Sequence, residues 1–130
     1  SVTSSQSTTM RGRAVARSGV LLGSAATDQL RGEVIETMAA IDPAAYRLGA
    51  AAVWLADQRD RASAIDVPTL ILVGDEDVIT PPTLSDELGA LIRGSRVERI
   101  NAAGHLSNLE QPKLFNDCVD RFLSGIERQS

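Results

Sequence analysis

The sequence predicts an α/β fold, with a helical segment over residues 1–62 and a strand–helix–strand–helix segment over residues 63–130. Two observations carry this prediction. The strand expected at 69–73 contains the apolar run Leu70–Val73, which is typical of a central parallel strand with helices over both faces. A helical pattern follows this strand and also the next one, and strands that alternate with helices in this order form right-handed parallel crossover units.

The composition is that of an ordinary globular protein, and it argues against several classes of function. The chain has 130 residues, of which 43% are hydrophobic and 23% charged, with a net charge of −4. Basic residues are scattered among acidic ones, so we expect no nucleic-acid partner. The single Cys118 cannot form an internal disulfide. Because the N-terminus resembles no signal peptide and no apolar run is long enough to span a bilayer, we expect a cytoplasmic protein without a membrane partner.

The N-terminal segment is predicted to be helical and rich in alanine. Residues 1–9 are polar and are expected to form a frayed tail. Residues 10–26 predict a short helix and a turn. Residues 31–40 place apolar side chains at helical spacing and predict a short amphipathic helix.

A longer helix is expected to begin at Asp42, the predicted N-cap, with Pro43 at the first helical position. It is expected to run to about Gln58. Its apolar positions form one broad stripe: Ala44, Ala45, Leu48, Ala51, Ala52 and Leu55. Four charged residues are expected to end it: Asp57, Arg59, Asp60 and Arg61.

The C-terminal segment alternates strands and helices. After the strand that ends at Gly74, a helix is predicted from about Pro82 through Ile92, with Gly94 as its stop. A second strand is predicted at 96–100, and a last helix from about Pro112 to Gly125. The side chains expected to be buried by these two helices are Leu84, Leu88, Leu91, Ile92, Leu114, Phe115, Cys118, Val119, Phe122 and Leu123.

Two loops at the carboxyl ends of the predicted strands carry the candidate chemistry. The first contains Asp75, Glu76 and Asp77, and the second contains His105, the only histidine. Open parallel sheets bind ligands at this edge, and neighbouring strands would bring the two loops together. An aspartate that orients a histidine is half of a nucleophilic triad. Taken singly, the acids are more typical of a solvated turn or a helix N-terminus, and the histidine of a surface residue.

Residues 65–126 resemble the C-terminal end of α/β-hydrolases, especially the group that includes the 3-oxoadipate enol-lactonases. The matching stretches are Val67 through Asp77, Thr80-Pro81-Pro82, and Ala103 through Pro112, which contains a G-H-x-x-x-x-E-x-P segment. The resemblance implies that the fold is the C-terminal portion of an α/β-hydrolase sheet, preceded by a helical cap segment over 1–62. It also implies that Asp77, the third residue after Gly74, is the triad acid and that His105 is the triad base. Asp77, and neither of its two acidic neighbours, should therefore hydrogen-bond to the imidazole.

The nucleophile of that family is missing from the sequence. It lies in a G-x-S-x-G elbow before the cap, and no such motif occurs in residues 1–130. We therefore expect the chain to begin where the nucleophile-bearing half ends and to be inactive alone. Ser24 and Ser1 are weak substitutes, since neither has the context of an elbow, and Cys118 is best interpreted as a core residue.

The resemblance implies hydrolysis of a small ester or lactone through an acyl-enzyme, with a small-molecule substrate. One histidine and no cysteine cluster leave no recognisable metal-ligand set, and no cofactor is implied. Either Tyr46 or Trp54 would line the pocket under a cap, or both would pack the cap against the main domain. The expected partner is the missing N-terminal half or a second copy of the chain. The first alternative is a non-catalytic remnant or interaction module of the same fold. An acyltransferase or dehalogenase on the same scaffold ranks after it.

Overall fold

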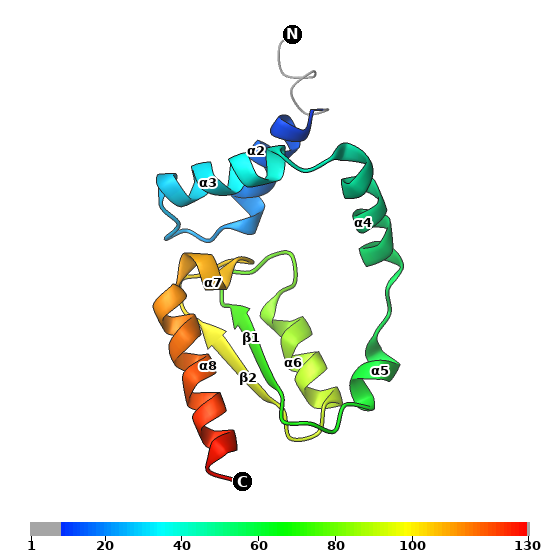
Figure 1. Ribbon diagram of the computed structural model, residues 1–130, viewed down its shortest axis with the longest axis vertical. Coiled ribbons are helices and arrows are strands. Elements are labelled where there is room, and N and C mark those ends of the chain that lie inside the picture. Colours follow the sequence, from blue (N-terminus) through cyan, green and yellow to red (C-terminus); the bar gives the residue numbers. More distant parts are fainter. Residues whose placement is uncertain (1–8, 130) are drawn as a thin grey trace. The chain divides into compact units, whose positions relative to one another are not determined.

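The computed structural model describes residues 9–129, which form two compact units (Figure 1). Residues 9–20 and 27–57 form the first unit, and residues 21–26 and 58–129 form the second. The predicted tail over 1–9 lies almost entirely outside the described residues, as does Ser1. The division into a cap segment over 1–62 and a core segment over 63–130 stays a prediction.

The first unit is helical, as predicted. It contains α2 (Met10–Leu21, whose last residue lies in the second unit), α3 (Asp28–Ala39) and α4 (Pro43–Leu55). Helix α3 begins three residues before the predicted start at 31. The reason is an N-cap, because the Thr27 side chain accepts a hydrogen bond of 3.1 Å from the backbone N–H of Leu30.

Helix α4 begins where the sequence predicts but ends earlier. The Asp42 side chain accepts a bond of 2.9 Å from the Ala45 N–H, and Pro43 occupies the first turn. The helix ends at Leu55, because Ala56 adopts an extended backbone. The prediction that charged residues at 57–61 end a helix reaching Gln58 is therefore wrong, and three of those residues belong to a separate short helix, α5 (Arg59–Ser63).

The apolar stripe of α4 is exposed, contrary to what its pattern suggests. Leu48 is 75% exposed and Leu55 is 87% exposed, and Ala44, Ala45, Ala51 and Ala52 are exposed as well. The pattern therefore indicates a face suited to burial that the first unit by itself does not bury.

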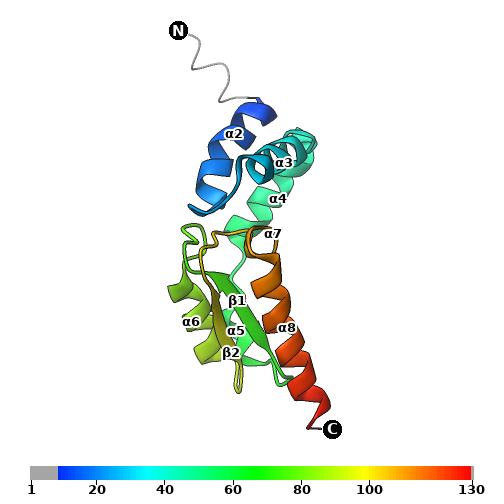
Figure 2. The same ribbon diagram turned by 90° about the vertical axis from the view of Figure 1, so that its left-hand side faces the viewer.

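The second unit confirms the predicted order of strands and helices. Strands β1 (Leu70–Gly74) and β2 (Arg96–Ile100) pair in parallel, with Gly74 opposite Ile100. Helices α6 (Pro82–Leu91) and α8 (Pro112–Glu127) cover opposite faces of this pair (Figure 2). Within residues 9–129, β1 pairs with β2 alone, so its other edge carries no partner strand.

The C-terminal boundaries differ from the prediction at two places. Helix α8 continues through Gly125 to Glu127, so the expected stop at Gly125 is wrong. A side chain at Gly125 would meet open space, and this glycine is an ordinary helical residue. The loop before α8 contains a short helix that the sequence did not predict, α7 (Ser107–Glu110). Helix α6 ends at Leu91, because Ile92 adopts an extended backbone, and Gly94 follows in a turn with a φ of +72°.

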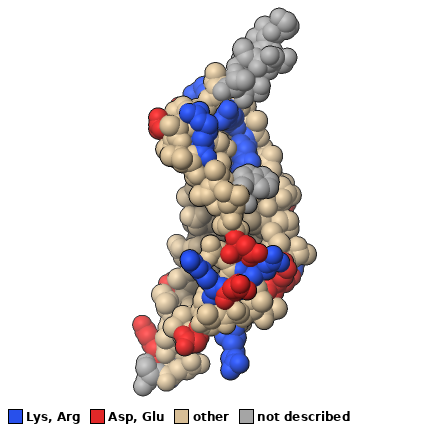
Figure 3. Space-filling model, turned by 90° about the vertical axis from the view of Figure 1, so that its right-hand side faces the viewer, with Lys and Arg blue, Asp and Glu red and all other residues tan. Residues whose placement is uncertain are grey.

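The core of the second unit is small because the described sheet has two strands. Ile100, Ala103 and Cys118 form its centre, with Leu72 packed against it, so Cys118 is a core residue as predicted. Four side chains expected to be buried are exposed instead: Leu84, Leu88, Leu114 and Leu123. Two strands offer each helix a narrow face, so only one line of side chains per helix reaches the sheet. On the face shown in Figure 3, basic and acidic side chains of this unit lie side by side without a continuous basic patch.

Candidate active site

The acidic loop after β1 is attached to the loop that follows β2. The backbone N–H of Asp75 donates to the Ile100 carbonyl at 3.0 Å, and the N–H of Glu76 donates to the Ala103 carbonyl at 2.9 Å. These bonds continue the parallel ladder beyond the two strands. They place the acidic residues and the histidine at the same carboxyl edge of the sheet, where parallel sheets carry their sites.

Asp77 and His105 form a hydrogen-bonded pair at this edge. The Oδ2 atom of Asp77 lies 2.9 Å from Nδ1 of His105, the Asp77 carboxyl group is almost fully buried, and one third of the His105 side chain is exposed. Asp75 instead accepts a long bond from the Ala103 N–H, and Glu76 accepts bonds from Ser24. The prediction that Asp77, rather than either neighbouring acid, contacts the imidazole is confirmed as geometry.

The Asp77 carboxylate is stabilised by four donors. Its Oδ1 atom accepts bonds from the N–H groups of Ile79 at 2.9 Å and Thr80 at 3.0 Å, and its Oδ2 atom accepts the Thr80 hydroxyl at 3.0 Å in addition to His105. Burial by itself raises the pKa of Asp77. The hydrogen bonds from His105, Thr80 and Ile79 outweigh it and hold that pKa below its ordinary value. Asp77 is therefore ionised at neutral pH.

An ionised carboxylate fixes the tautomer of the histidine, because it can only accept hydrogen bonds. Nδ1 of His105 must carry the proton, and Nε2 keeps a free lone pair. The Thr80 hydroxyl donates to Asp77 and lies 3.2 Å from the same Nδ1 atom, so its oxygen also faces the imidazole N–H. The arrangement can take up a proton at Nε2 and stabilise the resulting imidazolium.

Leu21, Glu110 and Gly23 take part in hydrogen bonds that hold the backbone around His105, and the sequence analysis missed these roles. The Leu21 carbonyl accepts the His105 N–H at 2.7 Å. The Glu110 carboxylate accepts N–H groups from Gly104, Leu106 and Gly23, the last at 2.6 Å. Glu110 was visible as the glutamate of the G-H-x-x-x-x-E-x-P segment, whereas nothing in the local sequence indicates the contact with Leu21 and Gly23.

Three glycines permit this close contact. Gly74, Gly104 and Gly23 meet backbone to backbone, where a side chain on any of them would overlap neighbouring main chain. A Cβ atom on Gly104 would lie 2.6 Å from the Gly23 nitrogen and 2.7 Å from the Leu21 carbonyl oxygen. Such distances are too short for any residue with a side chain, so glycine is required here by packing.

Among the described residues, Ser24 and Cys118 receive no support from the geometry as substitute nucleophiles. The Ser24 hydroxyl donates to Glu76 Oε1 at 2.6 Å, so its proton is directed to that carboxylate. This bond and the Ser24 backbone N–H lower the pKa of Glu76. Cys118 is buried on the inner face of α8, where burial raises the pKa of its thiol and keeps it protonated.

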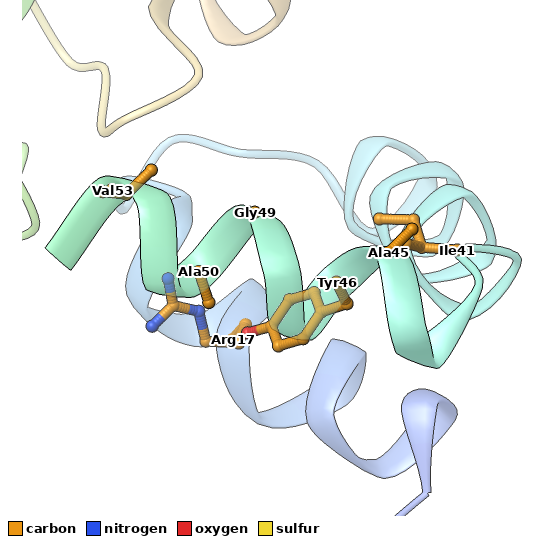
Figure 4. Close-up of a pocket in the computed structure, with 7 residues that line it drawn as sticks. All are labelled: Arg17, Ile41, Ala45, Tyr46, Gly49, Ala50 and Val53. Atoms are coloured by element: carbon orange, nitrogen blue, oxygen red, sulfur yellow. The ribbon is translucent and has the colours of Figure 1, made fainter. Parts of the chain in front are cut away.

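Tyr46 lines an open pocket within the first unit. The pocket has a volume of about 420 Å³ and is lined by Arg17, Ile41, Ala45, Tyr46, Gly49, Ala50 and Val53. Figure 4 shows the Arg17 guanidinium on the same side of α4 as the Tyr46 ring. The ring also packs against the Arg13 guanidinium, 5.8 Å from its centroid. The side chain of Trp54, the other candidate, lies outside the described residues.

Residues 9–129 contain no cluster of three or more histidine, cysteine, aspartate or glutamate side chains that could hold a metal ion. Over the same range, no helix is both long enough and apolar enough to cross a bilayer.

A protein-family model described as alpha/beta hydrolase fold matches residues 12–112. Among characterised proteins, the chain is 32% identical over 100 residues to 3-oxoadipate enol-lactonase 1 of Acinetobacter baylyi, covering 77% of this chain and 37% of that protein. It is 30% identical over 107 residues to a pimeloyl-[acyl-carrier protein] methyl ester esterase of Neisseria meningitidis, covering 82% and 34% of the two chains.

Solved structures show the same likeness. The enol-lactonase of Burkholderia xenovorans LB400 superimposes with a TM-score of 0.80 at 26% identity, over 88% of this chain and 45% of that one. An esterase of Exiguobacterium antarcticum gives a TM-score of 0.83 at 19% identity, over 94% and 46%. The chain thus spans about a third of the length of the characterised relatives and less than half of these solved structures.

Proposed function

The chain belongs to the α/β-hydrolase fold family, and we propose that it supplies the acid and the base of a Ser-His-Asp triad that hydrolyses a small ester or lactone. The observation that carries the proposal is the Asp77–His105 pair, with 2.9 Å between Oδ2 and Nδ1 at the carboxyl edge of a parallel sheet. The substrate class is suggested by two relatives, one named as an enol-lactonase and the other as a methyl ester esterase.

The proposed roles follow from the tautomer. With its proton on Nδ1, His105 uses Nε2 as the general base that takes the proton of the nucleophile, and then as the general acid that gives it to the leaving group. Asp77 keeps the ring oriented and stabilises the imidazolium that forms in between. The serine lies outside residues 1–130, because no G-x-S-x-G motif occurs among them.

Without the nucleophile and the oxyanion hole, residues 1–130 are expected to have no hydrolase activity by themselves. A base and an orienting acid without a nucleophile or oxyanion hole lack the groups that contribute most of the rate. We therefore propose that the N-terminal half of the hydrolase supplies the nucleophile, on this polypeptide or on another. Two features support a partner: the edge of β1 with no paired strand among the described residues, and the exposed apolar stripe of α4.

The exposed stripe of α4 also favours a second candidate, a non-catalytic module that uses the same surface for binding only. Acyl transfer or dehalogenation on the same scaffold depends on the identity of the nucleophile, and no side chain of this chain distinguishes them. The two main candidates differ in whether His105 has a chemical role.

The test uses the purified material with any polypeptide that accompanies it. Intact-mass measurement identifies a second chain, and a fluorophosphonate probe marks a nucleophilic serine by covalent attachment. We expect labelling outside residues 1–130 and none within them, with loss of labelling and of ester turnover in Asp77→Asn and His105→Ala. Asp75→Asn is the matched control, since Asp75 does not contact the imidazole.

Two results would contradict the proposal. One is turnover of an activated ester by the isolated chain that His105→Ala abolishes, since a nucleophile would then lie within these residues. The other is an active complex whose labelling and turnover are the same in His105→Ala as in the parent. The second result would favour the binding module.

A further inference from the structure

The backbone around His105 is held by the side chain of nearby Glu110 and by the carbonyl of Leu21, which is distant in sequence. Three consecutive N–H groups are each bonded: Gly104 to Glu110 at 3.0 Å, His105 to the Leu21 carbonyl at 2.7 Å, and Leu106 to Glu110 at 3.2 Å. We define residues 104–106 as the histidine loop. None of these bonds involves the imidazole, and together they fix the peptide units from which the ring projects.

The Glu110 carboxylate also holds a second segment. Its Oε1 atom accepts a hydrogen bond of 2.6 Å from the N–H of Gly23, a residue 87 positions away in the sequence. We define residues 21–24 as the bridging segment. One carboxylate therefore accepts hydrogen bonds from N–H groups of both the histidine loop and the bridging segment, and so joins them.

The bridging segment is bonded at its other end to the loop that carries Asp77. Glu76, the residue before Asp77, accepts the Ser24 N–H at 3.0 Å and the Ser24 hydroxyl at 2.6 Å. The segment thus contacts the acid loop through Glu76 and the histidine loop through Glu110. It connects the backbones of the two residues whose side chains meet at 2.9 Å.

The bridging segment and the histidine loop pack so closely that a shift of one would displace the other. Side chains on Gly23 or Gly104 would overlap each other's backbone, so the two segments pack at the closest approach that main chain allows. An orienting contact in a triad depends on placement within about half an ångström, and supporting hydrogen bonds of this kind provide it.

We propose that Glu110 is a positioning residue for His105, which acts by binding the histidine loop to the bridging segment so that Nδ1 stays on Asp77. This inference rests on the proposed function, since it assigns a role at the same site. A carboxylate is needed because both of its oxygens face N–H donors. A glutamine would turn an NH2 group toward one set of these donors, and it would lose the charge that strengthens the bonds.

The test measures the tautomer of the imidazole, which a merely structural role would not change in folded protein. The chain has one histidine, so the ¹⁵N resonances of its ring are assigned without ambiguity. In the parent we expect the neutral ring in the Nδ1–H form. In Glu110→Gln, which releases one side of the loop, we expect the Nδ1–H fraction of the folded protein to fall by about twofold or more.

Two controls and a second variant make the outcome decisive. Glu87→Gln changes an exposed carboxylate of α6 outside the Glu110 network, and Gly125→Ala adds a methyl group in open space; neither should change the tautomer. Gly23→Ala perturbs the bridging segment while leaving the charge of Glu110 in place. It should shift the tautomer in the same direction as Glu110→Gln.

Each alternative result has one meaning. A parent ring mainly in the Nε2–H form would overturn the Asp77–His105 pair, and with it both the proposed function and the positioning role. A parent ring in the Nδ1–H form that is unchanged in folded Glu110→Gln would overturn the positioning role alone. Loss of folding in both test variants, while both controls fold, would also overturn it and leave Glu110 a purely structural residue.

Discussion

Two regions of the chain are built largely from small and apolar residues, yet they are buried to opposite extents. One is helix α4. The other is the junction at the carboxyl ends of β1 and β2, where Gly74, Ile100 and Ala103 lie together. In α4, Leu48 and Leu55 are almost fully exposed. At the junction, Ile100 and Ala103 are at most 1% exposed, and a side chain on Gly74 would overlap the backbone of Ala103 and Gly104. The two regions differ in whether other segments of the same compact unit pack against them.

The difference shows what an apolar pattern does and does not indicate. A stripe at helical spacing indicates that a face is suited to burial, and it carries no information about where the partner surface comes from. A junction of glycines indicates close approach of backbones, which requires that the partner segments be present. In this chain the candidate site lies in the second kind of region.

The largest expected effect separates the two regions directly. Ile100→Ala should lower the free energy of unfolding by about 3 kcal/mol, because it leaves a cavity beside Ala103 and Cys118. Leu55→Ala should change it by less than about 0.5 kcal/mol in material free of other polypeptides, since that side chain is exposed. Urea unfolding measures both values. Equal losses would mean that the α4 stripe is covered in solution, and the comparison between the two regions would fail.

A second prediction tests the glycine junction. Gly74→Ala should destabilise the chain by about 2 kcal/mol, because the new methyl group would overlap the carbonyl oxygens of Ala103 and Gly104. Gly125→Ala is the matched control in α8, where the methyl group meets open space and should stabilise the helix by about 0.5 kcal/mol. Opposite signs in urea midpoints would support the packing argument. A neutral Gly74→Ala would show that the junction relaxes freely.

Much of the fold could be predicted because strands and helix starts depend on local signals. The strand at 96–100 and the Asp42–Pro43 helix start are both where the sequence places them. Helix ends were less predictable. Gly125 resembled a stop, but α8 passes through it, since a glycine without a competing turn does not end a helix.

The Asp77–His105 pair could be predicted from the sequence, whereas the contacts that hold its backbone in place could not. Asp77 and His105 follow two consecutive strands, and parallel pairing makes their loops neighbours. The bridging segment was not predictable, because Gly23 lies 87 residues from Glu110 and no local pattern links them. Contacts of that kind depend on tertiary packing, which periodicity and turn signals do not report.

A smaller effect is expected at the start of α4. Asp42→Ala removes the side-chain acceptor of the Ala45 N–H and should cost about 1 kcal/mol. Because α4 packs loosely, we expect the loss to be local, seen as roughly fivefold faster amide hydrogen exchange within α4 and unchanged exchange in β1 and β2. Asp120→Ala, an exposed change in α8 with no side-chain contact, is the control. Faster exchange throughout the second unit would mean that the two regions unfold together.

The smallest expected effect concerns pH and the buried Asp77. The pKa of this carboxyl is lower in the folded chain than in the unfolded one, because hydrogen bonds from His105, Thr80 and Ile79 outweigh its burial. The unfolded state therefore binds the proton more readily. The stabilisation is fully present above the unfolded pKa and is lost as the pH falls through the folded pKa.

Thr80→Val removes one of these donors and leaves the two backbone N–H groups in place, so the pKa of Asp77 should rise toward its ordinary value. The cost at neutral pH should be about 1 kcal/mol or less. It should shrink as the pH is lowered, because a protonated Asp77 gains little from the hydroxyl. Glu76 and Glu98 also have lowered pKa values and contribute to acid unfolding in every variant. The informative quantity is therefore the difference from Thr83→Val, an exposed threonine on α6. A difference in unfolding free energy that stays constant down to the acid transition would contradict the idea that Thr80 acts through the charge of Asp77, and would reduce its role to packing beside the imidazole.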